Sequence, residues 1–252
     1  SQGLEPLGEA ISQLHFPDDE GSQEAADQRV SFEEFFFVQV SVILRRLSIV
    51  QKKGFEHYLP PEFHERFRRA FPFELTKAQK KAVADIGADM ARPTPMLRLL
   101  QGDVGSGKTV VSFFGCLAAV TNGRQAAIMA PTEILAEQHF STFSRYFGDG
   151  PFGEVRAVLL NSSLKKKERA AALAKIRSGE IDVVVGTHAL LEEGVEFKAL
   201  SFVCVDEQHK FGVKQRALLS SKGDNPDVLV LPATADAAVP PADRARRGHD
   251  HP

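Results

Sequence analysis

The chain has 252 residues, of which 43% are hydrophobic and 25% charged, a composition ordinary for a globular protein and too apolar for wholesale disorder. The 31 Lys and Arg residues and 33 Asp and Glu residues give a formal net charge of -2, so no overall basic field marks a nucleic-acid binder. Cys116 and Cys204 lie far apart without ligand-like neighbours, which argues against a disulfide framework and a zinc cluster. No apolar run approaches the ~18 residues of a spanning helix. We therefore expect a cytoplasmic protein without a membrane segment.

Residues 1–74 are predicted to form a linker followed by helices. Residues 18–22 are polar and indicate an exposed turn. From Ser31 the pattern becomes helical, because Ser31 and Glu34 have the spacing of a capping box and apolar residues then recur at helical intervals. The phenylalanines of residues 32–37 share this spacing, which favours packing between domains over base stacking. We interpret residues 1–74 as a helical connector and not as a complete domain.

Residues 75–231 alternate between short apolar runs and helical patterns. The predicted strands are residues 96–100, 126–130, 155–160, 181–185, 202–205 and 228–231. The predicted helices between them are residues 109–121, 133–146 and 165–178. Strands without polar alternation, separated by helices, indicate a mainly parallel sheet covered on both faces, which is an α/β fold. Residues 232–252, rich in Ala, Pro and Arg, are predicted to be a disordered tail.

A phosphate-binding loop is predicted between the first strand and the helix that follows it. Its residues fit the pattern of Gly, four residues, then Gly-Lys-Ser/Thr: Gly102, Asp103, Val104, Gly105, Ser106, Gly107, Lys108 and Thr109. The glycines let successive backbone N–H groups point at phosphate oxygens, and the helix presents its positive end to the same anion. Lys108 can reach the β- and γ-phosphates of ATP, and the Thr109 hydroxyl is placed to ligate Mg²⁺.

A second acidic motif follows a buried strand. Asp206 and Glu207 come directly after residues 202–205. In a phosphate-loop enzyme, Asp206 would hold Mg²⁺ and Glu207 would orient or deprotonate the attacking water. For an isolated Asp-Glu pair the commoner role is to cap the next helix, but the preceding strand and the phosphate loop favour catalysis. We therefore predict Lys108, Asp206 and Glu207 as catalytic residues.

Further motifs make the chain resemble superfamily 2 helicases, and within them the RecG branch. The matching segments are Asp206-Glu207-Gln208-His209, residues 130–139, residues 186–191, residues 211–216, and residues 73–79. The resemblance implies a P-loop NTPase domain of the RecA-like type at residues 75–231. It also implies that residues 1–74 are the connector from a separate wedge domain, which splits the fork. It also implies a monomeric ATP-dependent motor that acts on branched DNA, such as forks and Holliday junctions, in recombination and repair.

The resemblance assigns roles to individual residues. Phe73, Thr76 and Gln79 would contact the adenine side of ATP. Thr132, Thr187 and His188 would lie along the DNA backbone, although Thr132 also suits the N-cap of a helix. Gln208 and His209 would couple the nucleotide state to the DNA-binding surface.

Two segments depart from the family pattern. Asn161-Ser162-Ser163 stands where the family usually has a turn that contains glycine. After Leu231 the sequence loses the family pattern, for which a frame-shifted reading frame is one hypothesis. The chain alone would then bind Mg-ATP weakly, bind DNA weakly and hydrolyse ATP slowly, because helicases use an arginine from a second RecA-like domain. The alternatives are a lone nucleotide-binding module and a related DNA translocase such as the transcription-repair coupling factor.

Overall fold

The computed structural model describes residues 5–50, 53–103, 105–148, 152–153, 155–206 and 218–232, without the side chains of residues 42 and 45–50. The chain divides into two compact units, residues 1–52 and residues 53–252. Within the described residues, no helix is both long and apolar enough to cross a membrane.

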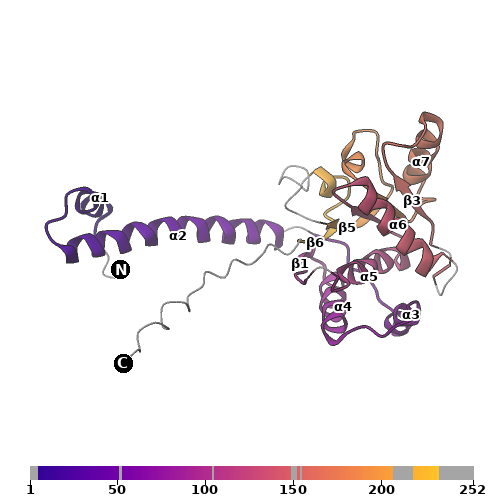
Figure 1. Ribbon diagram of the computed structural model, residues 1–252, viewed down its shortest axis with the longest axis horizontal. Helices are drawn as coiled ribbons and strands as arrows, with labels where there is room; N and C mark the ends of the chain where they lie inside the picture. Colours follow the sequence, from indigo (N-terminus) through magenta and orange to yellow (C-terminus); the bar gives the residue numbers. More distant parts are fainter. Residues whose placement is uncertain are drawn as a thin grey trace, which may run out of the picture. The chain divides into compact units, whose positions relative to one another are not determined.

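The first unit is a pair of helices that pack against each other, α1 (Leu7–His15) and α2 (Glu20–Val50) (Figure 1). Ala10 and Ala26 are fully buried. The prediction that the helix begins at Ser31 is wrong, because α2 begins eleven residues earlier and Ser31 lies within it. Asp19 provides the N-terminal cap, since its Oδ1 accepts the Ser22 N–H at 2.7 Å. Neither α1 nor the first turns of α2 were predicted.

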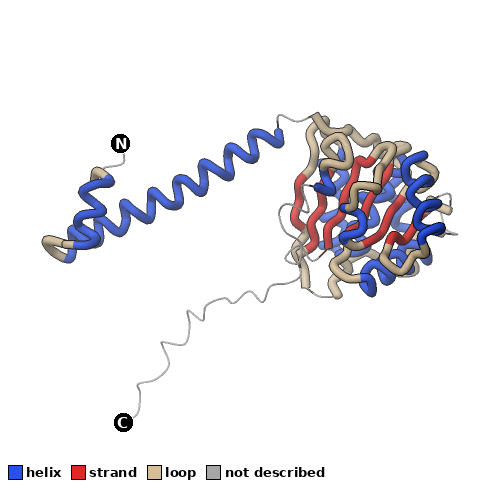
Figure 2. The backbone as a smooth tube through the Cα atoms, turned by 90° about the horizontal axis from the view of Figure 1, so that it is seen from above, coloured by secondary structure: helices blue, strands red, loops and turns tan. Residues whose placement is uncertain are grey.

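The second unit contains a six-stranded sheet in which every neighbouring pair is parallel. The strand order is β1-β6-β5-β2-β4-β3. The strands are β1 (Leu97–Leu99), β2 (Gln125–Met129), β3 (Ala157–Leu160), β4 (Val183–Gly186), β5 (Leu200–Asp206) and β6 (Asp227–Leu231). They lie side by side with helices packed around them (Figure 2). The predicted α/β fold with a parallel sheet, preceded by a helical segment, is confirmed.

Helices cover both faces of the sheet because its side chains alternate between two cores. Val183 and Val185 belong to one core, whereas Val184 between them belongs to the other. The first core contains residues of α3 (Phe63–Arg69), α4 (Lys77–Met90), α5 (Lys108–Thr121) and α6 (Glu133–Phe147). The second contains Ile176 of α7 (Lys166–Ser178) and Leu190 of the short helix η1 (His188–Leu191).

Residues 53–74, which the sequence assigns to the connector, pack within the second unit. Phe63 and Phe67 of α3 are 2% and 1% exposed, and their ring centroids lie 5.2 and 5.3 Å from that of Phe114 on α5. The division between the compact units thus lies at residues 52 and 53 and not at residues 74 and 75. The predicted tail from residue 233 onward lies outside the described residues.

The strand register aligns the carboxyl ends of all six strands along one edge of the sheet. One continuous row of paired residues crosses the sheet through Leu99, Val230, Val205, Met129, Gly186 and Leu160. The predicted phosphate loop follows the first of these residues in the chain, and the predicted acidic motif follows Val205. Open parallel sheets bind ligands at this edge.

Candidate nucleotide and DNA site

The predicted phosphate loop leaves the sheet after β1 and enters α5 at Lys108. Gly105 and Gly107 have φ angles of +79° and +77°, the left-handed region in which glycine carries no steric cost. Gly107 is the N-cap of α5, so the curl of the loop ends at the positive end of a helix of 14 residues. Val104 lies outside the described residues. The backbone thus has the form that cradles a phosphate group.

The Lys108 side chain folds over its own loop. Its Nζ donates hydrogen bonds to the backbone oxygens of Gly102 and Asp103, the second at 3.0 Å. The ammonium group therefore lies inside the curl that the glycines form. Thr109 occupies the first turn of α5, next to this charge. A lysine, a hydroxyl group and a glycine cradle are the donor set that fits the phosphates of Mg-ATP.

The predicted adenine motif is joined to the phosphate loop by Gln79. Thr76 caps α4 through a capping box: its Oγ1 accepts the Gln79 N–H at 3.2 Å, and Gln79 Oε1 accepts the Thr76 N–H at 2.9 Å. The Gln79 side-chain amide also donates to the Ser106 backbone oxygen at 3.0 Å. This hydrogen bond joins the start of α4 to the phosphate loop, two segments whose bonded residues are 27 positions apart in the chain.

The hydrogen-bonding groups that remain on the Gln79 side chain suit an adenine base. Within the described residues, its two side-chain bonds leave one N–H and one oxygen lone pair of the amide, the pair of groups with which glutamine can bind adenine. Phe73 is 43% exposed, and its ring lies 5.4 Å from that of Phe71 and 6.3 Å from that of Tyr146. The position of Phe73 leaves a ring face at the surface beside the motif.

Asp206 ends β5, and its carboxylate meets a residue that the sequence did not single out. His139 Nε2 lies 2.7 Å from Asp206 Oδ2, and the two side chains are 8% and 16% exposed. Thr109 and Asp206 are the predicted Mg²⁺ ligands, both lie among the described residues, and their role at the metal stays a prediction. Glu207, Gln208 and His209 lie outside the described residues, so their roles stay predictions.

The three predicted DNA contacts differ in exposure. Thr132 is exposed and caps α6, since its Oγ1 accepts the Leu135 N–H at 3.3 Å, which confirms the N-cap prediction. His188 is exposed at the start of η1. Thr187 is only 2% exposed, so its side chain does not form part of a surface that DNA could touch. A role of Thr187 at the DNA backbone would thus fall to its main chain and stays a prediction.

Glu133 links the loops on this edge. Its Oε1 accepts the backbone N–H of Ser162 at 3.1 Å and also the Ser162 hydroxyl. The hydrogen bonds from Ser162, followed by the positive potential of His188, lower the pKa of the Glu133 carboxyl. The serine that replaces the family's glycine-containing turn is thus bonded to the first residue of α6.

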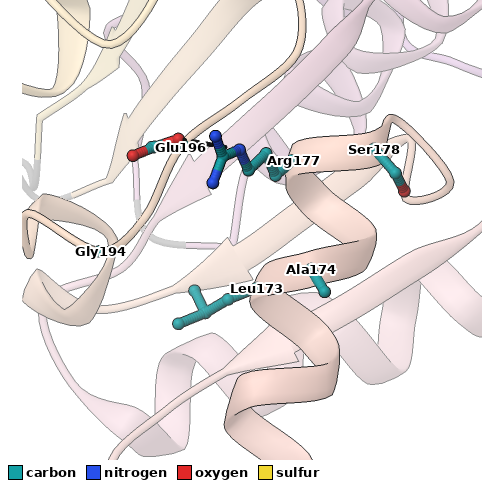
Figure 3. Close-up of a pocket in the computed structure, with 6 residues that line it drawn as sticks. All are labelled: Leu173, Ala174, Arg177, Ser178, Gly194 and Glu196. Atoms are coloured by element: carbon teal, nitrogen blue, oxygen red, sulfur yellow. Dashed lines mark ion pairs between the residues drawn. The ribbon is translucent and has the colours of Figure 1, made fainter.

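A separate hollow of about 520 Å³ lies between α7 and the segment before β5 (Figure 3). Arg177 and Glu196 form an ion pair across it at 3.2 Å. Its lining residues are Leu173, Ala174, Arg177, Ser178, Gly194 and Glu196. None of the predicted site residues belongs to this hollow.

Comparisons with known proteins agree with this arrangement. Residues 76–240 match the model of the DEAD/DEAH box helicase family, nine residues beyond the predicted end of the domain at residue 231. The chain is 44% identical over 229 residues to the ATP-dependent DNA helicase RecG of Synechocystis sp. and 44% identical over 227 residues to that of Bacillus subtilis. A solved structure of RecG bound to a three-way DNA junction superposes with a TM-score of 0.78 at 39% identity.

The chain spans about a third of the length of these relatives. The two alignments cover 90% of this chain but 27% and 33% of the relatives, and the superposition covers 90% of this chain and 30% of the RecG chain. The family match itself extends over more than half of the chain and includes the phosphate loop and Asp206. The chain therefore belongs to the DEAD/DEAH box helicase family.

Proposed function

We propose that this chain is the ATP-binding domain of an ATP-dependent DNA helicase of the RecG type. The observation that carries the proposal is the hydrogen bond from the Gln79 side chain to Ser106, which joins the adenine motif to the phosphate loop. A glycine-rich turn without a nucleotide role would not need a glutamine from another helix against its backbone. The 44% identity to RecG proteins favours DNA as the polymer on which the motor acts.

The residues of the site then divide the work of ATP hydrolysis. The backbone N–H groups of residues 102–109 bind the phosphates, and the Lys108 ammonium, released from its own loop carbonyls, binds the β- and γ-phosphates. Thr109 and Asp206 would hold Mg²⁺, which would supply positive charge to the phosphates. Glu207 orients or deprotonates the attacking water. Phe73, Thr76 and Gln79 would bind the adenine side of ATP and so help to place its phosphates at the loop.

DNA is proposed to cross the edge formed by the loops after β2 and β4. The exposed Thr132 and His188 would hydrogen-bond to phosphate oxygens, which positions a strand without reading its sequence. Thr187 would shape the turn that presents His188. Gln208 and His209 would couple this surface to the nucleotide. In keeping with the RecG relatives, we infer branched DNA as the substrate and a monomeric, cytoplasmic protein as the form in which the domain acts.

Binding of a fluorescent three-way DNA junction, followed by anisotropy, tests the DNA part of the proposal. His188→Ala should weaken binding about two- to tenfold, the value of one hydrogen bond. Ser141→Ala, at an exposed position of α6 away from this edge, is the matched control and should leave the affinity unchanged. A wild-type chain that does not bind the junction, or a His188→Ala chain with wild-type affinity, would contradict the proposal.

A further inference from the structure

His139 occupies an unusual position on α6. The buried face of this helix consists of Ala136, His139, Phe143 and Phe147, and the other three of these residues are at most 1% exposed. A polar ring in an otherwise apolar face loses its hydration on folding and needs a partner inside the protein. Its partner is Asp206, 67 residues later in the chain, at a distance of 2.7 Å.

The bond orients the proposed metal ligand. An ionised carboxylate can only accept hydrogen bonds, so the Nε2 atom of His139 carries the proton and donates it to Asp206 Oδ2. The donor comes from a helix whose neighbouring side chains are packed in the core, which holds the imidazole ring in place. Asp206 is the last residue of β5, so the bond from His139 acts on a carboxylate at the very end of the strand.

We propose that His139 is a positioning residue that fixes the Asp206 carboxylate in the orientation needed to hold Mg²⁺ beside a nucleotide. The proposal rests on the proposed function, because it presupposes that Asp206 holds the metal. Residues that orient metal ligands through hydrogen bonds typically contribute about 10–100-fold to metal affinity or activity. His139 would therefore affect the Mg²⁺ dependence of nucleotide binding more than the binding of the nucleotide itself.

A pair of nearly isosteric variants separates this role from simple packing. Gln places an amide N–H about where His139 Nε2 lies, whereas Met has a similar shape without a hydrogen-bond donor. His139→Gln and His139→Met would be compared with the wild-type chain and with Ser141→Ala, an exposed substitution on the same helix. Thermal unfolding of each chain establishes that the variants are folded at the temperature of the binding measurement.

The measurement is the fluorescence of a ribose-labelled ATP analogue during a Mg²⁺ titration. We expect the Mg²⁺ midpoint of His139→Met to rise about tenfold, the lower end of the effect of such residues. The midpoint of His139→Gln should stay close to that of the wild-type chain. Without Mg²⁺, all four chains should bind the analogue equally, because the phosphate loop is intact.

The possible results separate the positioning role of His139 from simple packing and from a failure of the proposed function. Equal Mg²⁺ midpoints for the Gln and Met variants would overturn the positioning role and leave His139 as a core residue, even if both variants were less stable. A wild-type chain that binds no nucleotide with or without Mg²⁺ would overturn the proposed function itself. Nucleotide binding that weakens equally in the presence and absence of Mg²⁺ in His139→Met would also contradict the proposal, because it would indicate a general disturbance of the site.

Discussion

We predict that the stability of the second unit depends on His57, a buried histidine at the edge of the sheet where the strands begin. His57 is 1% exposed, and its Nδ1 lies 3.2 Å from Asp227 Oδ2 while its Nε2 lies 2.9 Å from the Ser201 hydroxyl. The second carboxylate oxygen of Asp227 accepts the Met96 N–H at 2.6 Å. This network joins the segment before α3 to the starts of β5 and β6. His57 Nδ1 also lies 3.3 Å from the Met90 backbone oxygen. Burial raises the pKa of Asp227, and the neighbouring His57 imidazole opposes that rise.

His57→Ala should strongly destabilise the second unit. Asp227 is 3% exposed, and once His57 is gone the Met96 N–H is the remaining partner of its carboxylate among the described residues. Removing one partner of a buried pair typically costs about 3–5 kcal/mol of unfolding free energy, a large part of the total for a single domain. In an Asp227→Asn background the loss should be smaller, because no uncompensated charge remains and the amide oxygen can still accept from Met96.

Urea unfolding monitored by tyrosine fluorescence measures the effect. The chain has no tryptophan, and its two tyrosines, Tyr58 and Tyr146, both lie in the second unit, so the signal reports on that unit. The two single variants and the double variant form a thermodynamic cycle that gives the coupling energy of the pair. Arg68→Ala, which breaks a surface ion pair on α3, is the control and should change stability little. A loss below about 1 kcal/mol for His57→Ala would refute the reasoning.

Three further predictions concern the nucleotide site and its surroundings. Gly107→Ala forces a side chain into a φ of +77° and puts its Cβ 2.4 Å from Gln79 Nε2, which should strain the loop by about 1–2 kcal/mol. We therefore expect weaker ATP binding in a calorimetric titration, and an unchanged affinity would contradict this. Burial raises the pKa of both Cys116 and Cys204, so neither thiol should react with a disulfide reagent at pH 8 until urea is added. Labelling of the native chain would contradict the burial of these two thiols. Ser162→Ala should raise the pKa of Glu133 toward its usual value of 4.5 in an NMR titration, because the bonds from Ser162 hold it down. Their stabilising effect is present above that usual value and is lost as the pH falls through the lowered pKa, and a pKa unaffected by the substitution would disprove the link.

The sheet could be predicted from the sequence because its strands are buried on both faces. Runs such as residues 181–185 contain no polar alternation, and all six predicted runs are within two residues of the observed strand at each end. The phosphate loop could be predicted because its geometry is local: the glycines, the lysine and the helix that follows lie within a few residues of one another. Buried periodicity and short-range motifs are the signals that a single sequence carries best.

Features that depend on distant contacts could not be predicted in this way. The bond from Gln79 to Ser106 spans 27 residues and the bond from His139 to Asp206 spans 67, and no local pattern signals either. The start of α2 was misplaced because Ser31 has capping spacing, whereas Asp19 provides the cap. Thr187 matched the family's DNA motif, but its burial depends on how η1 packs against the sheet.

The central claim is that residues 102–109 together with Gln79 form an ATP site, and calorimetric titration with a non-hydrolysable ATP analogue and Mg²⁺ tests it most directly. The wild-type chain should bind the analogue, and Lys108→Ala should bind it about tenfold or more weakly, because a hydrogen bond from a charged group is worth about 1.5–3 kcal/mol. Lys167→Ala, which removes an exposed charge on α7, should bind like the wild-type chain. Absence of binding by the wild-type chain, or equal affinity for Lys108→Ala, would contradict the account.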